Sequence, residues 1–238
     1  MIRIQPLDAL APGTFPDPER ALVEPNGLLA FGGDLSPQRL VAAYAHGIFP
    51  WYSEGDPLLW WSPDPRCVFA TDDVHASHSL VKFLRKCAWQ WSMDRAFEDV
   101  MHACAAPRDG QPETWITPDM ITAYTNLHLL GHAHSLEVWE GDALVGGIYG
   151  VAVGRMFSAE SMFSRRANAS KVALLLLARV LRQRGFPWID AQVPNPHLLR
   201  MGARMLSRKR FLEELARLTA EPAPRDWPRA RTPVRRLS

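Results

Sequence analysis

The pattern of hydrophobic and polar positions divides the chain near residue 65. Before that point, Pro, Gly and aromatic residues recur every few positions, as in FPDP, FGGDLSP and LLWWSPDP. Pro and Gly residues at this frequency permit only short helices and strands. One helix is predicted there: Pro37 stands in its first turn, Asp34 or Ser36 caps it, and Gly47 ends it. We interpret residues 1–65 as a small, aromatic-rich amino-terminal domain.

Beyond residue 65 the spacing of apolar positions becomes regular. It predicts helices over 77–86, 97–105, 117–131, 168–185 and 197–203. It predicts strands over 66–70, 135–141, 143–154, 155–164 and 186–195, with a weak last strand over 205–211. Runs of strands against segregated helices predict an α+β fold. The helix between the last two long strands permits one parallel pair through a right-handed crossover.

Composition limits the class of protein. The chain has 238 residues, of which 47% are hydrophobic and 22% are charged, and this is a globular composition. No apolar run approaches the roughly 20 residues that a membrane helix needs. The first residues lack the apolar core of a secretory signal. We therefore expect a cytoplasmic protein without a membrane partner.

The ends of the chain differ in charge. Residues 200–238 hold 11 Lys and Arg against 4 Asp and Glu, whereas residues 1–199 hold 16 against 21. A basic end indicates an anionic partner such as RNA, or else a solvated tail, and charge alone leaves both open. We take 66–220 as the main domain. The segment 221–238 is a tail rich in Pro and Arg, for which we predict poor order.

The cysteines and histidines give no support to a metal site. Three cysteines without a C-x-x-C pair argue against a disulfide framework and against a zinc-thiolate site. His128, His132 and His134 are close in sequence, but no carboxylate completes a recognisable zinc signature. We interpret them as surface or cap histidines and expect no metal.

Polar residues interrupt two predicted strands where a plain core strand would be apolar. Because side chains alternate faces, Trp188, Asp190 and Gln192 share one face, with Asp190 and Gln192 about 7 Å apart. Ser158 and Glu160 share a face of the strand before. A carboxylate buried in a sheet is costly without a partner. These residues either face a cavity or lie on the exposed face of an antiparallel sheet, and spacing leaves both possible.

Known motifs exclude some chemistries. A GNAT-type acetyltransferase binds pyrophosphate in a Gly-rich loop before a helix, but the corresponding stretch here, SRRANASK, has no glycine. No G-x-G-x-x-G or G-x-S-x-G motif is present, which argues against a dinucleotide site and a serine hydrolase. An acetyltransferase and a non-catalytic RNA-binding module remain as rivals to the interpretation that follows.

A series of motifs carries a family resemblance. EPNGLLAFGGDLSPQRLVAAYAHGIFPWY, LLWWSPDPR, TWIT, GHAHSLEVW, LVGGIYGVAVG, FSAESMFS, NASK and IDAQVPN occur in this order between about Phe15 and Phe211. Together they closely resemble the bacterial leucyl/phenylalanyl-tRNA–protein transferases. The resemblance implies a small amino-terminal domain followed by a larger GNAT-like acyltransferase domain with a mostly antiparallel sheet.

The resemblance also implies a function. Such an enzyme moves Leu or Phe, and less often Met, from aminoacyl-tRNA to the α-amino group of proteins that begin with Lys or Arg. The product carries an N-degron for protein degradation. No cofactor is implied, and we expect a monomer.

Site residues follow by motif match. Asp190 and Gln192 correspond to the catalytic pair. The residues that correspond to substrate-binding positions are Glu160, Met162, Phe157, Ile148, Leu177, Trp51, Trp115 and Asn195. The family tends to carry an aromatic residue where this chain has Leu177, which bears on the balance between Leu and Phe.

Physical chemistry limits the role of the catalytic pair. Aminoacyl-tRNA is an activated ester, so the enzyme must mainly position two reactants. An Asp of ordinary pKa, about 4, is a weak base toward an α-ammonium of pKa about 8. We expect Asp190 to orient the ammonium and accept its proton transiently with Gln192, or to position it while a ribose hydroxyl carries the proton.

One basic stripe is a candidate tRNA contact. Lys82, Arg85 and Lys86 fall at helical spacing on one face of the helix predicted over 77–86. They either bind the phosphate backbone of the acceptor stem or form a solvated helix face.

Overall fold

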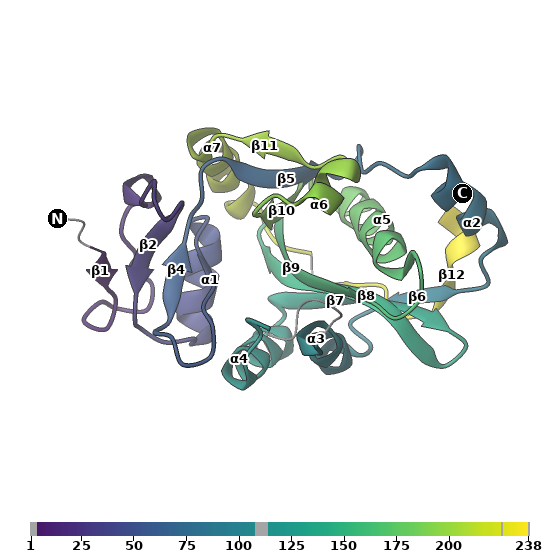
Figure 1. The fold of residues 1–238 in the computed structure, drawn as a ribbon, viewed down its shortest axis with the longest axis horizontal. Helices are drawn as coiled ribbons and strands as arrows, with labels where there is room; N and C mark the ends of the chain where they lie inside the picture. The colour runs from purple at the N-terminus through teal and green to yellow at the C-terminus, as the bar shows by residue number, and fades with distance from the viewer. Residues whose placement is uncertain (1–3, 108–113, 225, 238) are drawn as a thin grey trace.

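Two sheets organise the protein. The computed structural model describes residues 4–107, 114–224 and 226–237. The smaller sheet has the strand order β1-β2-β4-β3 and the larger one the order β11-β5-β10-β9-β8-β7-β6-β12 (Figure 1). The strands of the smaller sheet are β1 (Gln5–Pro6), β2 (Leu28–Phe31), β3 (Phe49–Pro50) and β4 (Leu59–Trp61). They lie within the predicted amino-terminal segment.

The larger sheet is mostly antiparallel. Its strands are β5 (Arg66–Ala70), β6 (Gln90–Met93), β7 (Ala133–Glu140), β8 (Ala143–Val153), β9 (Met156–Ser164), β10 (Trp188–Gln192), β11 (Arg204–Leu206) and β12 (Thr232–Pro233). Within this sheet β9 and β10 pair in parallel, and the helix between them makes the crossover. The predicted α+β class is confirmed.

Helices cover both faces of the larger sheet. They are α1 (Pro37–Ala45), α2 (His78–Lys86), α3 (Phe97–Ala105), α4 (Pro118–Leu129), α5 (Ala169–Gln183), α6 (Pro196–Arg200) and α7 (Arg208–Thr219). Two short 3₁₀ helices are η1 (Pro18–Arg20) and η2 (Val234–Leu237). In Figure 1, α5 lies on one face of β7, β8 and β9, and α3 and α4 lie on the other.

Local sequence explains where these helices begin. Ser36, Ser77 and Thr117 accept hydrogen bonds from the first turns of α1, α2 and α4, as the predicted cap positions require. Close packing of α5 depends on Gly146, because a Cβ there would lie 2.5 Å from the Cβ of Ala169. The absence of a side chain at Gly146 therefore lets the start of α5 pack against the backbone of β8.

Two large apolar clusters lie on opposite sides of the larger sheet. One is the core under α5, with Leu174, Ile148 and Ile189. The other joins α1 and the smaller sheet to α3 and α4, and includes Tyr44 and Tyr124. The amino-terminal elements therefore share a core with the main sheet, and this shared packing fixes their position beside it.

The structure corrects the prediction at the carboxyl end. The last strand, predicted over 205–211, is present but shorter: β11 covers only Arg204–Leu206, and Ser207 then caps α7 over the rest of the predicted range. The poor order predicted for the tail is wrong for its described residues. Val234 is fully buried, Trp227 packs on His134, and β12 pairs with β6, a strand that the sequence pattern did not predict.

Among the described residues, no helix has the length and apolar character needed to cross a membrane.

Candidate active site

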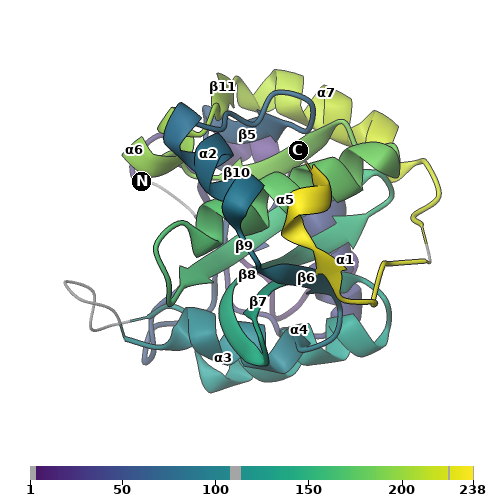
Figure 2. The ribbon, with the colours of Figure 1, turned by 90° about the vertical axis from the view of Figure 1, so that its right-hand side faces the viewer.

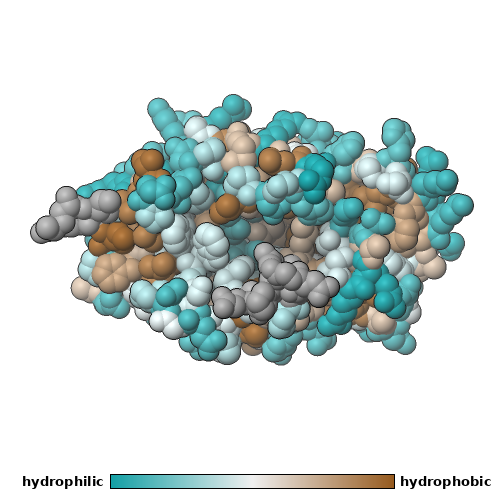
Figure 3. Space-filling model, viewed as in Figure 1, coloured by the Kyte–Doolittle hydropathy of each residue, from teal (hydrophilic) through white to brown (hydrophobic). Residues whose placement is uncertain are grey.

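A cavity opens where two parallel strands separate. β9 and β10 pair only from Met156–Trp188 to Ser158–Asp190, although β9 continues to Ser164. A cavity of about 390 Å³ lies beyond the last pair, and the front of the molecule is hollowed at its centre (Figure 3). Its lining residues are Phe49, Pro50, Trp51, Phe69, Trp115, Ile148, Ala159, Glu160, Ser161, Met162, Leu174, Ile189, Ala191, Gln192, Val193, Pro194, Asn195 and Leu198.

Bulges in both strands shape the polar edge of the cavity. The β10 register shifts between Asp190 and Gln192, and Gln192 has a φ of 56°. The register of β9 against β8 shifts as well, which makes Glu160 the extra residue. The bulge in β10 interrupts the strict alternation on which the predicted convergence of Asp190 and Gln192 rested. The side chains that meet are Gln192 and Glu160: Nε2 donates to Oε1 at 2.8 Å.

Asp190 lies behind the cavity wall. It is 1% exposed, and its Oδ1 and Oδ2 accept hydrogen bonds from Nε and Nη2 of Arg66 at 2.8 and 2.7 Å. The backbone N–H of Gln192 also donates to Oδ1, at 3.0 Å, and the Ser158 hydroxyl donates to Oδ2 at 3.3 Å. Asp190 thus ties the bulged backbone at Gln192 to a buried cation.

Arg66 joins three parts of the fold. Its guanidinium lies over the rings of Phe49 and Phe211, at 4.8 and 4.7 Å from their centroids. It also donates to the Gly47 carbonyl at 3.0 Å. One buried cation therefore links β5 to the loop after α1, to α7 and, through Asp190, to β10.

Glu160 is the carboxyl group that faces the cavity. Burial is the main cause that raises its pKa to about 8; the nearby charge of Asp190 acts in the same direction, and hydrogen bonds from Tyr44 and Gln192 oppose the shift. The Tyr124 hydroxyl donates to Glu160 Oε2 at 3.5 Å and contacts the Tyr44 hydroxyl. Burial also raises the pKa of both phenols well above 10. At neutral pH the protonated form of Glu160 therefore predominates. Its carboxyl group ends a chain of contacts that runs from the Tyr44 hydroxyl through the Tyr124 hydroxyl.

The apolar wall lies on the α5 side. Ile148 and Met162, predicted to bind substrate, both line the cavity. Phe157 and Leu177 are fully buried in the core under α5 and are not among the lining residues. Leu174, one turn before Leu177, lines the cavity instead.

The remaining predicted residues lie around the opening. Trp51 and Trp115 line the cavity, and Trp51 is 43% exposed. Asn195 lines it too, and its side-chain oxygen caps α6 by accepting from the Leu198 N–H at 2.9 Å. Their roles in binding stay predictions.

The basic stripe lies away from the cavity. Lys82, Arg85 and Lys86 are exposed on α2, which packs beside η2 (Figure 2). None of them is among the lining residues. Contact of this stripe with tRNA stays a prediction.

The sequence analysis missed Arg66, Tyr44, Tyr124 and Leu174 as site residues. One signal was available for Arg66, since an arginine opens the apolar strand RCVFA. A buried arginine needs an acidic partner, and a search for that partner leads to Asp190. The tyrosines carried no such signal, because each fits an amphipathic helix.

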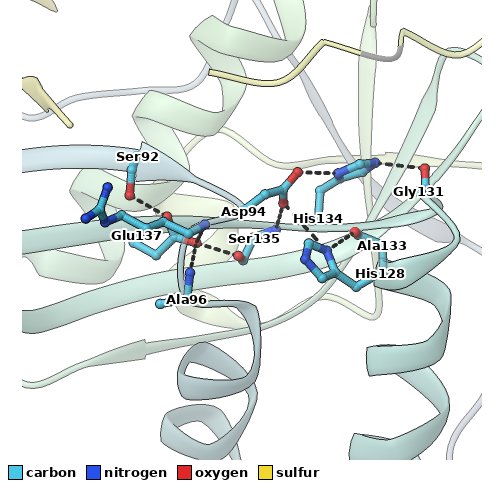
Figure 4. Close-up of polar contacts among 10 residues, drawn as sticks. Ser92, Asp94, Ala96, His128, Gly131, Ala133, His134, Ser135 and Glu137 are labelled. Atoms are coloured by element: carbon cyan, nitrogen blue, oxygen red, sulfur yellow. Dashed lines mark hydrogen bonds and ion pairs between the residues drawn. The ribbon is translucent and has the colours of Figure 1, made fainter. Parts of the chain in front are cut away.

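A second polar cluster involves a carboxylate that the sequence analysis did not associate with the histidines. Asp94 accepts from His134 Nδ1 at 2.7 Å, and His128 Nδ1 lies 3.9 Å from it (Figure 4). Ligand atoms of these three residues lie within 4.8 Å of one another, so they could hold a cation. However, the other His134 nitrogen faces the Gly131 carbonyl at 3.2 Å, and His128 Nδ1 faces the Ala133 carbonyl at 2.8 Å. Hydrogen bonds account for this cluster.

Comparison with known proteins gives a consistent result. The family described as leucyl/phenylalanyl-tRNA protein transferase matches residues 68–216, and its amino-terminal domain matches residues 33–64. A curated protein of Xanthomonas euvesicatoria pv. vesicatoria, named leucyl/phenylalanyl-tRNA–protein transferase, is 60% identical over 93% of this chain and 89% of its own length. One of Shewanella piezotolerans with the same name is 52% identical over 93% and 94%.

Likeness to solved structures is more distant. A GCN5-related N-acetyltransferase from Kribbella flavida has a TM-score of 0.37 at 10% identity, over 68% of this chain and 58% of its own.

The family match and the curated relatives identify the protein with this sheet and cavity as an aminoacyltransferase. The chain belongs to the family of leucyl/phenylalanyl-tRNA–protein transferases, as the sequence motifs predicted.

Proposed function

We propose that the protein transfers Leu or Phe, and also Met, from aminoacyl-tRNA to the α-amino group of proteins that begin with Lys or Arg. The observation that carries this proposal is the cavity, which combines an apolar wall under α5 with two polar groups, Glu160 and Gln192, at its edge. An unbranched or γ-branched apolar side chain fits such a wall. A hydrophobic slot discriminates a methylene by only about 1–3 kcal/mol, which is consistent with several accepted amino acids.

The reaction is aminolysis of an ester. The acceptor nitrogen attacks the ester carbonyl, a C–N bond forms, and the C–O bond to the terminal ribose breaks. The proton lost by the amine goes to the departing ribose oxygen. With an α-amino pKa near 8, about one amine in ten is neutral at pH 7, so positioning of that amine is the main task.

Glu160 and Gln192 are proposed to contact the reacting groups. Gln192 Nε2 donates to Glu160, which leaves the side-chain oxygen of Gln192 to accept a hydrogen bond from the attacking amine. Glu160 can ionise when the ammonium of the bound amino acid arrives, because that charge offsets the burial that raises its pKa.

Asp190 is proposed to act through Gln192. Both of its oxygens accept from Arg66, and Oδ1 also accepts from the Gln192 backbone. Both roles that the sequence left open, base and direct positioning of the amine, require Asp190 to reach the amine, but Asp190 is 1% exposed and does not line the cavity. We therefore propose a third role, in which Asp190 positions Gln192. Asp190 then holds the bulge that aims the Gln192 side chain into the cavity.

The wider biological role is part of the same proposal. The added Leu or Phe creates an N-degron that directs the acceptor to degradation. The enzyme is proposed to act as a monomer in the cytoplasm, where charged tRNA is present, and size-exclusion chromatography with light scattering tests the monomer.

Transfer of labelled leucine from charged tRNA tests the function. Peptides that differ only in a first residue of Arg, Lys or Ala serve as acceptors. We expect label on the Arg and Lys peptides and none on the Ala peptide. Equal labelling of all three would refute the acceptor rule, and absence of transfer to any would refute the function. Labelled acetyl-CoA in the same assay tests the acetyltransferase rival.

A further inference from the structure

Basic side chains lie on α5 and α6, two helices that each contribute a residue to the lining of the cavity. Lys171 lies in the first turn of α5, three residues before Leu174, so both project from one face of the helix. Leu174 lines the cavity, and Lys171 lies one turn nearer the start of α5. His197 and Arg200 lie on α6, whose Leu198 also lines the cavity.

These three side chains act on one another. Burial lowers the pKa of His197, and the charges of Lys171 and Arg200 lower it further. His197 is therefore mainly neutral at pH 7, and it lies close enough to Lys171 on α5 and to Arg200 on its own helix to be affected by both charges.

Among the described residues, no carboxylate pairs with this cluster. Lys171 Nζ contacts only the Asn168 side-chain oxygen, at 3.5 Å, and none of the three residues forms an ion pair within the described ranges. Arginines elsewhere differ: Arg204 on β11 binds Asp73, and Arg66 binds Asp190. The positive end of α5 adds to the charge, because its cap residue Asn168 makes no side-chain cap bond.

We propose that Lys171, His197 and Arg200 form a phosphate subsite, which binds a phosphodiester near the 3′ terminus of the donor RNA while its amino acid occupies the cavity. The inference rests on the proposed function, since a tRNA donor must pass its terminal backbone over this opening. Lys171 and Arg200 supply charge, and His197 supplies an N–H donor. Such contacts read no sequence, but they set the register of the ester against Gln192.

Two non-reactive ligands isolate the phosphate. One is 3′-leucylamino-3′-deoxyadenosine, which has no phosphate, and the other is the same nucleoside joined through its 5′ oxygen to cytidine by one phosphodiester. Calorimetry compares their Kd values for the wild type and for the triple variant Lys171→Gln, His197→Gln, Arg200→Gln. We expect the Kd of the phosphodiester ligand to rise roughly tenfold or more, because at least one charge-assisted contact is lost. The loss should be specific to that ligand.

Control variants make the result specific. Lys171→Arg keeps the charge and should keep the affinity for the phosphodiester ligand. Arg20→Gln removes an exposed charge from the amino-terminal region and should change neither Kd. If the triple variant does not fold, the single variant Arg200→Gln, at an exposed position, replaces it in the comparison of the two Kd values.

Two results would overturn the subsite. Equal losses for both ligands would mean that the substitutions disturb the cavity, and unaltered Kd values for both would make the cluster an ordinary solvated surface. Failure of the proposed function is separate, because it appears as a wild type that binds both ligands and transfers no leucine.

Discussion

Arg66 and Asp190 lie 124 residues apart in sequence and form a two-pronged ion pair in which both side chains are 1% exposed. A pair buried this deeply has lost its hydration, so each charge depends on the other. Because Asp190 also accepts from the Gln192 backbone, the pair controls the geometry of the cavity edge. This relationship supports the positional role proposed for Asp190, which the motif match assigned to the catalytic pair.

The first prediction concerns Asp190→Asn. It leaves the Arg66 charge buried without a partner, so the free energy of unfolding should fall by about 3–5 kcal/mol. The single-turnover transfer rate should fall as well. The folded variant should still bind tRNA. Urea denaturation and rapid-quench transfer measure the two effects.

Two variants separate position from stability. Gln192→Ala leaves the ion pair intact, so it should slow transfer at nearly unchanged stability. Arg66→Met with Asp190→Leu removes both charges and should recover much of the stability without recovering the rate. A single-turnover rate in Asp190→Asn comparable to wild type would contradict any catalytic or positioning role for Asp190.

The second prediction concerns donor selection. Leu174→Ala enlarges the apolar wall, so use of Phe relative to Leu should rise by roughly tenfold, as expected for a volume change of this kind. Competition between leucyl-tRNA and phenylalanyl-tRNA measures the ratio. Val180→Ala, buried on the same helix away from the cavity, is the matched control and should leave the ratio unchanged.

Leu177→Phe tests the family comparison directly. Leu177 is fully buried in the core, so the larger ring is expected to cost about 1–3 kcal/mol of stability unless neighbours move. The sequence prediction is a shifted Leu:Phe ratio. An unchanged ratio would mean that Leu177 does not shape the donor pocket.

The third prediction concerns pH. The pKa of Glu160 is about 8 in the folded protein and near 4.5 when unfolded, so folding favours its protonated form. Its contribution to stability is complete below pH 4.5 and is lost as pH rises through 8. Glu160→Gln resembles the protonated form, so its stability relative to wild type should increase between pH 5.5 and 8.5. Denaturant midpoints at the two pH values measure this, and a pH-independent difference would contradict the raised pKa.

The fourth prediction concerns the stripe on α2. Substitution of Lys82, Arg85 and Lys86 by Glu should weaken tRNA binding. The slope of the logarithm of the binding constant against the logarithm of salt concentration should become shallower by about 0.7–0.9 for each lost phosphate contact. Lys209→Glu with Arg210→Glu, at exposed positions of α7, is the control for a general charge effect. Wild-type affinity in the α2 variant would make the stripe a solvated face.

The sequence by itself determined the family, the order of the main elements and the α+β class. Those properties depend on local periodicity, on caps such as Ser77 and Thr117, and on motifs that each lie within one segment. Local periodicity did not predict the strands that form only by pairing with segments distant in the sequence. β6 pairs with β7, in which Val138 is the partner of Trp91, and β12 pairs with the other edge of β6 through Thr232, 141 residues after Trp91. No local window of the sequence contains these partners.

Only the tertiary structure decided how the site is built. Strand alternation placed Asp190 and Gln192 together, but bulges in β9 and β10 bring Gln192 to Glu160 and leave Asp190 with Arg66. The physical reason is that a buried carboxylate must be paired. The partner that satisfies it is chosen by the whole fold, because Arg66 reaches Asp190 only when β5, α1 and α7 have packed around it.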